Sequence, residues 1–176
     1  PYSGQYAWIM GPITLSHMDA SISADHTKDW EVNVEKYARS HNYQYSTRDE
    51  DLTYNPDNEV VGTSILQRVF DVKNKSTDME AVVGAIKSIK ETLVKLDADI
   101  ARRVYRNQFR SADRKDISLV YPFESWTRFE NSNGLPPNFA TSYDKINGKG
   151  SWQNNVVKVL DNHTDGWYDE IRVMIK

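Results

Sequence analysis

Residues 65–96 read ILQRVFDVKNKSTDMEAVVGAIKSIKETLVKL, and this stretch decides the fold of the chain. Its first part, Ile65 to Val72, is rich in apolar side chains and predicts a strand. Thr77-Asp78-Met79-Glu80 then matches a capping box, which predicts the start of a helix. Apolar residues follow at three- and four-residue steps and form one stripe: Met79, Val82, Val83, Ile86, Ile89, Leu93 and Leu96. The stretch therefore predicts a strand that leads into a helix with one buried side.

The rest of the C-terminal half repeats this alternation. Strands are predicted at about Arg102–Phe109 and Ile117–Phe123, with a charged turn over 110–115 between them. A second helix is predicted from Ser151, and a last strand over Trp167–Ile175. The order strand, helix, strand, strand, helix, strand is that of the split β-α-β arrangement, in which four antiparallel strands carry both helices on one face. We expect an α+β fold of this ferredoxin-like kind.

The N-terminal part predicts a shorter set of elements. Tyr6–Met10 is apolar and precedes Gly-Pro, a helix is expected over about His26–Arg39, and Tyr43–Tyr45 alternates as a strand does. An acidic stretch with the turn signal Asn55-Pro56-Asp57 follows. We therefore place a boundary there, with a strand-helix-strand extension over 1–59 and the α/β unit over 60–176.

Composition excludes several classes of function. The chain of 176 residues has 22 basic and 25 acidic side chains and a net charge of −3, which disfavours nucleic acid as a partner. No apolar run approaches the ~20 residues that cross a bilayer, so no membrane association is expected. Cysteine is absent, which excludes disulfides, thiolate catalysis and cysteine-ligated metals. The chain begins with Pro1, which slightly favours export after removal of a signal peptide over a cytoplasmic location, and the compartment stays open.

Alternation along the predicted strands separates two faces of the sheet. The face toward the helices is almost wholly apolar: Leu66, Phe70, Val72, Tyr105, Phe109, Ile117, Leu119, Tyr121, Phe123, Ile171, Val173 and Ile175. The opposite face combines apolar and charged residues: Gln67, Val69, Asp71, Val104, Arg106, Gln108, Ser118, Val120, Pro122, Tyr168, Glu170, Arg172 and Met174. This second face is too apolar for water and too charged for a core, which favours a covering layer that leaves a polar pocket.

Candidate ligand-binding residues lie on that second face. Arg106, Glu170 and Arg172 must pair if they are covered, because an unpaired buried charge is costly. One interpretation is a structural ion-pair network or a solvated face. The other is a polar anchor for an anionic or carbonyl-bearing ligand, with Tyr168 as a hydrogen-bonding partner.

No motif specific to a reaction is present. The Gly-x-Ser-x-Gly, His-Glu-x-x-His, Walker and dinucleotide patterns are absent, so no catalytic residue and no cofactor are predicted. His26 and His41 are separated by roughly 22 Å if they lie on one helix, too far to share a metal, and no metal site is predicted.

The element order over Ile65–Ile175 resembles the dimeric α/β-barrel superfamily, which includes antibiotic-biosynthesis-type monooxygenases. The resemblance implies a barrel that binds small aromatic or polyketide-like compounds, and some members are cofactor-free oxygenases or degrade haem. It also implies a homodimer, or a pseudo-dimer in which the N-terminal segment with Trp8, Trp30 and His41 is a degenerate repeat. We therefore expect a small-molecule-binding protein, with cofactor-independent oxygenase or isomerase activity as one form, and with Trp30 and His41 as further ligand contacts. The alternative is a non-catalytic structural or partner-binding domain.

Overall fold

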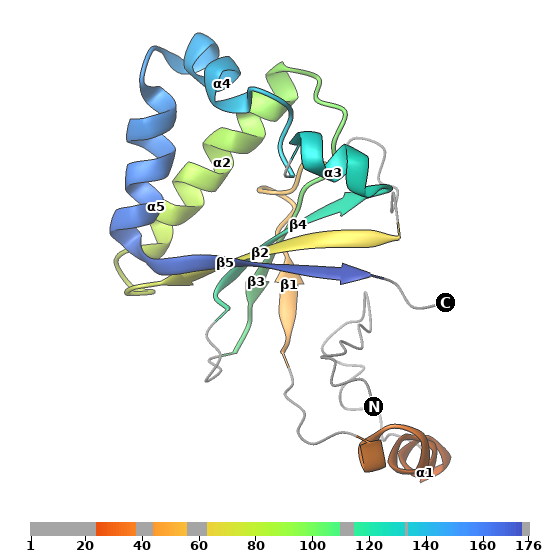
Figure 1. Ribbon diagram of the computed structural model, residues 1–176. Coiled ribbons are helices and arrows are strands. Elements are labelled where there is room, and N and C mark those ends of the chain that lie inside the picture. Colours follow the sequence, from red (N-terminus) through yellow and green to blue (C-terminus); the bar gives the residue numbers. More distant parts are fainter. Residues whose placement is uncertain (1–23, 38–43, 56–62, 110–114, 133, 174–176) are drawn as a thin grey trace. The chain divides into compact units, whose positions relative to one another are not determined.

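The computed structural model describes residues 24–37, 44–55, 63–109, 115–132 and 134–173 (Figure 1). The chain divides into two compact units, Pro1–Tyr43 and Gln44–Lys176. In the first unit, helix α1 spans Ala24–Asn33 and the short 3-10 helix η2 spans Glu35–Tyr37. The predicted helix from His26 is thereby confirmed in its position, whereas the predicted strand Tyr6–Met10 lies outside the described residues.

The second unit is built on one open, antiparallel sheet of five strands in the order β1-β3-β4-β2-β5. The strands are β1 (Ser46–Arg48), β2 (Ser64–Val72), β3 (Arg103–Asn107), β4 (Ile117–Phe123) and β5 (Thr164–Val173). β1 lies at one edge, next to β3, and β5 lies at the other, next to β2. Residues 44–55, which the sequence assigned to the N-terminal extension, therefore pack within this second unit.

The helices of the second unit lie on one side of the sheet (Figure 1). They are α2 (Met79–Lys95), α3 (Trp126–Ser132), α4 (Phe139–Asn147), the π-helical turn η3 (Gln153–Val157) and α5 (Lys158–His163). The helix predicted from Ser151 corresponds to η3 and α5. Helix α4 was not predicted, because only Phe139 and Tyr143, one turn apart, mark its buried side.

Two buried clusters hold this layer on the sheet. The first joins α2 to the strands and contains Leu52, Leu66, Phe70, Val72, Val82, Ile86, Val104, Ile117, Leu119, Tyr121 and Phe123. The second joins α2 to α4 and η3 and contains Tyr54, Ile89, Leu93, Ala98, Phe139, Tyr143 and Val156. The predicted apolar stripe of α2 is confirmed from Val82 to Leu93, where Val82, Ile86, Ile89 and Leu93 are buried, but Leu96 at its end is exposed.

The predicted capping box is wrong. Asp78, not Thr77, is the N-cap of α2, and its side chain makes no capping hydrogen bond. Its carboxylate instead accepts a hydrogen bond from the backbone N–H of Asn74 (3.0 Å) and lies 3.0 Å from Nδ1 of His163 at the end of α5. The Asp78 carboxylate is therefore bound by the preceding loop and by α5, and not by the first turn of α2.

Candidate ligand-binding face

The register of the sheet places residues on its two faces, because residues directly opposite each other point the same way. The face away from the helices, here called the mixed face, is formed by three rows across the strands. They are Arg48, Tyr105, Ser118, Val69 and Tyr168; Arg103, Val120, Gln67 and Glu170; and Pro122, Ile65 and Arg172. Among the described residues of the second unit, no helix lies on this side (Figure 1).

The structure corrects the predicted faces of β3. Val104 pairs with Leu119 and Arg106 with Ile117, so both point toward the helices, and Val104 is fully buried in the core. Tyr105, predicted on the helix side, lies opposite Ser118 on the mixed face. Because Val104 and Tyr105 are adjacent and both apolar, the sequence could not show which of them faces the core.

The predicted core at β5 is also only partly formed. Ile171 points to the helix side as expected, since it lies opposite Leu66. The helices do not bury it, however: Ile171 is 43% exposed and Val173 is 57% exposed. Phe109, predicted for the same core, lies beyond the end of β3 and is 52% exposed. The apolar core therefore stops short of the outer end of β5.

Three of the predicted site residues come together on the mixed face. Tyr168, Glu170 and Arg172 alternate along β5, and Arg172 Nη2 donates a hydrogen bond to Glu170 Oε2. The structure adds a partner that the sequence did not suggest, because Lys115 Nζ donates to Glu170 Oε1 at 2.9 Å. The same ammonium lies 5.9 Å from the centre of the Tyr168 ring, a cation–π distance. These four side chains form a cluster, here called the β5 cluster.

The backbone positions Lys115 for this role. It stands just before β4 with a φ of +42°, a conformation that side-chain-bearing residues rarely adopt. Its backbone N–H donates to Oδ1 of Asp71 at 2.8 Å, which ties the residue to β2. Strained backbone of this kind is often found where a side chain must be aimed at a functional site.

Electrostatics hold Glu170 in its charged form. Partial burial acts to raise its pKa, but the hydrogen bonds from Arg172 and Lys115 outweigh this and lower the pKa below its usual value. Partial burial likewise acts to lower the pKa of Lys115, yet its bond to Glu170 leaves that pKa raised. Lys115 and Arg172 bring two positive charges to one carboxylate, so these three side chains together carry a net positive charge.

Among the described residues, the middle of the mixed face carries no charged side chain. Val69 is fully buried between its neighbours, and Gln67 Nε2 donates to Ser118 Oγ at 3.1 Å. This neutral strip separates the β5 cluster from Arg103 and Tyr105 on β3. Val69, Gln67 and Ser118 are buried, so the groups that a ligand could reach are the cationic and aromatic side chains on either side of them.

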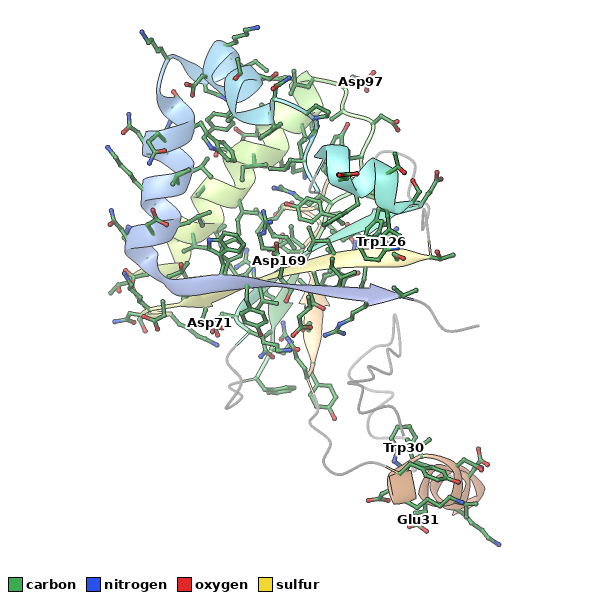
Figure 2. The ribbon with its side chains drawn as sticks, in the orientation of Figure 1. Trp30, Glu31, Asp71, Asp97, Trp126 and Asp169 are labelled. Atoms are coloured by element: carbon green, nitrogen blue, oxygen red, sulfur yellow. The ribbon has the colours of Figure 1, made fainter. Side chains whose placement is uncertain are left out.

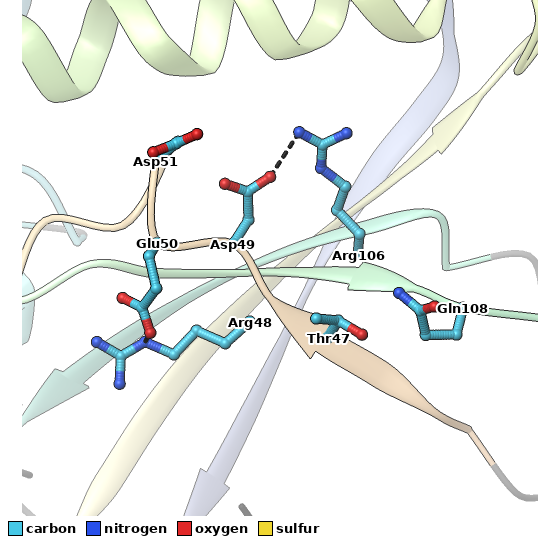
Figure 3. Close-up of a pocket in the computed structure, with 7 residues that line it drawn as sticks. All are labelled: Thr47, Arg48, Asp49, Glu50, Asp51, Arg106 and Gln108. Atoms are coloured by element: carbon cyan, nitrogen blue, oxygen red, sulfur yellow. Dashed lines mark ion pairs between the residues drawn. The ribbon is translucent and has the colours of Figure 1, made fainter. Parts of the chain in front are cut away.

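Arg106 contributes to a separate groove at the β1 edge (Figure 3). The groove has a volume of about 390 Å³ and is lined by Thr47, Arg48, Asp49, Glu50, Asp51, Arg106 and Gln108. Arg106 pairs with Asp49, and Arg48 Nε lies 3.0 Å from Glu50 Oε1. Small-molecule sites are mostly apolar with few polar groups, whereas this lining is polar throughout, and we assign no ligand to it.

The two N-terminal candidates belong to the first unit. Trp30 lies on α1 of the first unit, where it is half-buried, and His41 falls outside the described residues. In the described part of the chain, no group of three or more histidine or acidic side chains could hold a metal ion.

Side chains stand on both sides of the sheet in Figure 2, where Asp71 and Asp169 mark opposite faces.

The chain matches no protein-family model, no curated protein and no solved structure. No helix within the described ranges is both long enough and apolar enough to span a membrane.

Proposed function

We propose that the chain is a small-molecule-binding protein of the α/β-barrel type, and that its mixed face binds an aromatic compound carrying an acidic group. The observation that carries the proposal is the β5 cluster, in which Lys115 and Arg172 share one carboxylate. An acidic ligand would pair with Lys115 and Arg172, and a guanidinium is well suited to bind a carboxylate or phosphate. The rings of Tyr168 and Tyr105 suit a planar ligand body.

The ferredoxin-like class and the barrel are part of the same proposal. The order β5-β2-β4-β3 within the sheet is the one that a split β-α-β unit produces, with β1 added at its edge. A flat face seldom encloses enough of a small ligand, because ligand sites are concave. We propose that a second copy of the chain completes the site and makes the protein a homodimer.

The structure supports ligand binding more than catalysis at this face. A general base works best with a pKa near the working pH, whereas the pKa of Glu170 is lowered by its two cationic partners. Partial burial raises the pKa of Tyr168, so its phenol stays protonated and acts as a hydrogen-bond donor. An oxygenase or isomerase of the cofactor-independent kind would need a different proton acceptor, supplied by the ligand itself.

A second candidate is a protein-binding domain that uses the same face. Arg and Tyr are the residue types that dominate binding energies at protein interfaces, and Arg103, Arg172, Tyr105 and Tyr168 all stand here. A protein partner would leave the face without affinity for small acids, and this difference separates the two candidates.

Thermal unfolding with matched ligands tests the proposal. Naphthoate should raise the unfolding temperature because a ligand that binds only the folded state stabilises it, whereas neutral naphthalenemethanol should have little effect. Haem, a larger aromatic compound with acidic groups, belongs in the same screen. Arg172→Ala should abolish the naphthoate shift. Arg106→Ala is the matched control, since it also removes one guanidinium from one ion pair but on the other face.

Two results would contradict the proposal. No shift with naphthoate or haem at saturating concentration would exclude the acidic small molecule and favour the protein-binding candidate. A shift that survives Arg172→Ala and disappears in Arg106→Ala would move the site to the β1 groove.

A further inference from the structure

We infer that strand β5 joins two copies of the chain, pairing antiparallel with β5 of the second copy about a two-fold axis at Ile171. The inference rests on the homodimer of the proposed function and names the strand and the register that hold it together. It follows from the free edge of β5, from the apolar residues exposed there, and from the order of charges along the strand.

The outer edge of β5 is open to pairing. The strand runs for ten residues and is paired with β2 along its length, and no other strand among the described residues lies on its outer side. The opposite edge strand, β1, has only three residues. An edge strand presents unpaired N–H and C=O groups, and proteins usually protect it with charged side chains, proline or a bulge. The described strand contains no proline, its irregularity lies at the far end, next to Asp71 and Val72, and the charges it carries near Ile171 are self-complementary.

Exposed apolar side chains accompany this edge. Trp167 is 53% exposed, Ile171 43% and Val173 57%, and all three point to the helix side of the sheet. Apolar residues repeated on one face of a free edge strand indicate a surface that another strand covers. Pairing two such edges brings Ile171 against its copy and reduces the exposure of the apolar side chains near the axis.

The charges on β5 are self-complementary in one register. When the axis passes through Ile171, that residue faces its own copy, and Glu170 of each chain lies opposite Arg172 of the other. An axis at Asp169, Glu170 or Arg172 would instead place two like charges directly opposite each other. The register about Ile171 therefore favours association, and those about its charged neighbours oppose it.

This pairing brings two β5 clusters together. Directly opposite residues share a face, so the two Glu170–Arg172 pairs meet on the mixed face, with Lys115 at the outer side of each. The two-fold axis then lies within a continuous strip of four cations and two carboxylates. An acidic ligand bound there would contact residues of both copies, which couples ligand binding to dimer formation.

Cysteine cross-linking tests the register directly, because the chain contains no cysteine of its own. Directly opposite residues in an antiparallel pair have Cα atoms about 4.5–5.5 Å apart, which suits a disulfide. Ile171→Cys should give a covalent dimer on non-reducing gels under mild oxidation. Val94→Cys, at a more exposed site on α2, should stay monomeric on the same gel. Both positions are exposed, so neither variant is expected to unfold.

Charge reversal provides the second test. Arg172→Glu should dissociate the dimer in size-exclusion chromatography with light scattering, since it places two glutamates opposite each other. Combining it with Glu170→Arg should restore the dimer.

The results separate this inference from the proposed function. A chain that is monomeric, or one that is dimeric without Ile171→Cys cross-linking above the Val94→Cys level, would overturn the β5 register. Failure of the double charge reversal to restore the dimer would also count against it. A cross-linked dimer that shows no thermal shift with naphthoate would overturn the ligand proposal and leave the β5 pairing intact.

Discussion

Replacing Gly134 with alanine should destabilise the protein by about 3 kcal/mol, for two reasons that the structure separates. Gly134 has a φ of +86°, where a side-chain-bearing residue costs about 1–3 kcal/mol. A Cβ atom at this position would also lie 3.0 Å and 3.1 Å from the Tyr121 ring and 3.2 Å from Leu66 Cδ2. Both neighbours are buried in the core, and overpacking of this kind costs about 1–3 kcal/mol. The alanine also lowers the conformational entropy of the unfolded chain, which offsets about 0.4–1 kcal/mol of this loss of stability.

Two other glycines provide the controls. Gly166 also has a positive φ, of +137°, but a Cβ there meets nothing within 4 Å, so Gly166→Ala should cost only about 1–2 kcal/mol. Gly84 lies in the interior of α2 with open space around it, and Gly84→Ala should stabilise the protein by about 0.5–1 kcal/mol.

Urea unfolding of the three variants measures these differences, with stability taken from the midpoint and slope of each curve. A Gly134→Ala variant no less stable than Gly166→Ala would refute the argument that the loop packs tightly on Tyr121. A destabilising Gly84→Ala would show that α2 is crowded where the structure shows space.

Three further predictions concern the core and the carboxylates. Leu93→Ala should cost about 2–5 kcal/mol in urea unfolding, because the side chain is fully buried, whereas its half-exposed neighbour Val94→Ala should change stability by about 0.5 kcal/mol or less. Asp116→Asn should cost about 1–3 kcal/mol by the same assay, since this buried carboxylate accepts the backbone N–H of Val72 at 2.9 Å; no loss would show that the amide serves equally well. Hydrogen bonds from two backbone N–H groups lower the pKa of Asp144, so its stabilising effect is complete above its unfolded pKa of about 3.9 and disappears as the pH falls through the lower folded value. Asp144→Asn should therefore flatten the loss of stability in acid, and an unchanged pH profile would contradict this.

The sequence predicted the elements that alternate cleanly and failed where neighbouring residues were equivalent. Along β5, charged and apolar side chains alternate, and the placement of Tyr168, Glu170 and Arg172 on one face agrees with the structure. Along β3, apolar Val104 and Tyr105 are adjacent, and only the pairing with β4 shows which one enters the core. Arg106 therefore does not belong to the mixed face, although an arginine fits the ligand-binding role predicted for it.

Lys115 shows a second limit of prediction from the sequence. Its partner Glu170 is 55 positions away in the sequence, and the contact depends on a backbone turn with positive φ and on the register of three strands. Nothing in the local sequence around Lys115 signals this contact. The ligand role of the β5 cluster, like that of Trp30 and His41, stays a prediction for the experiments above.

The sequence alone determined the order of strands β2 to β5 and of helices α2 and α5, though not helix α4, because periodicity and turn residues act over a few neighbouring positions. Only the tertiary structure decided which face of β3 is buried, which cation joins Glu170, and how far the helices reach along β5. Those outcomes depend on strand register and on the lengths of elements that pack from distant parts of the chain. The exposed end of β5 is the clearest case: its apolar pattern predicts burial, and the helices that should bury it end before they reach it.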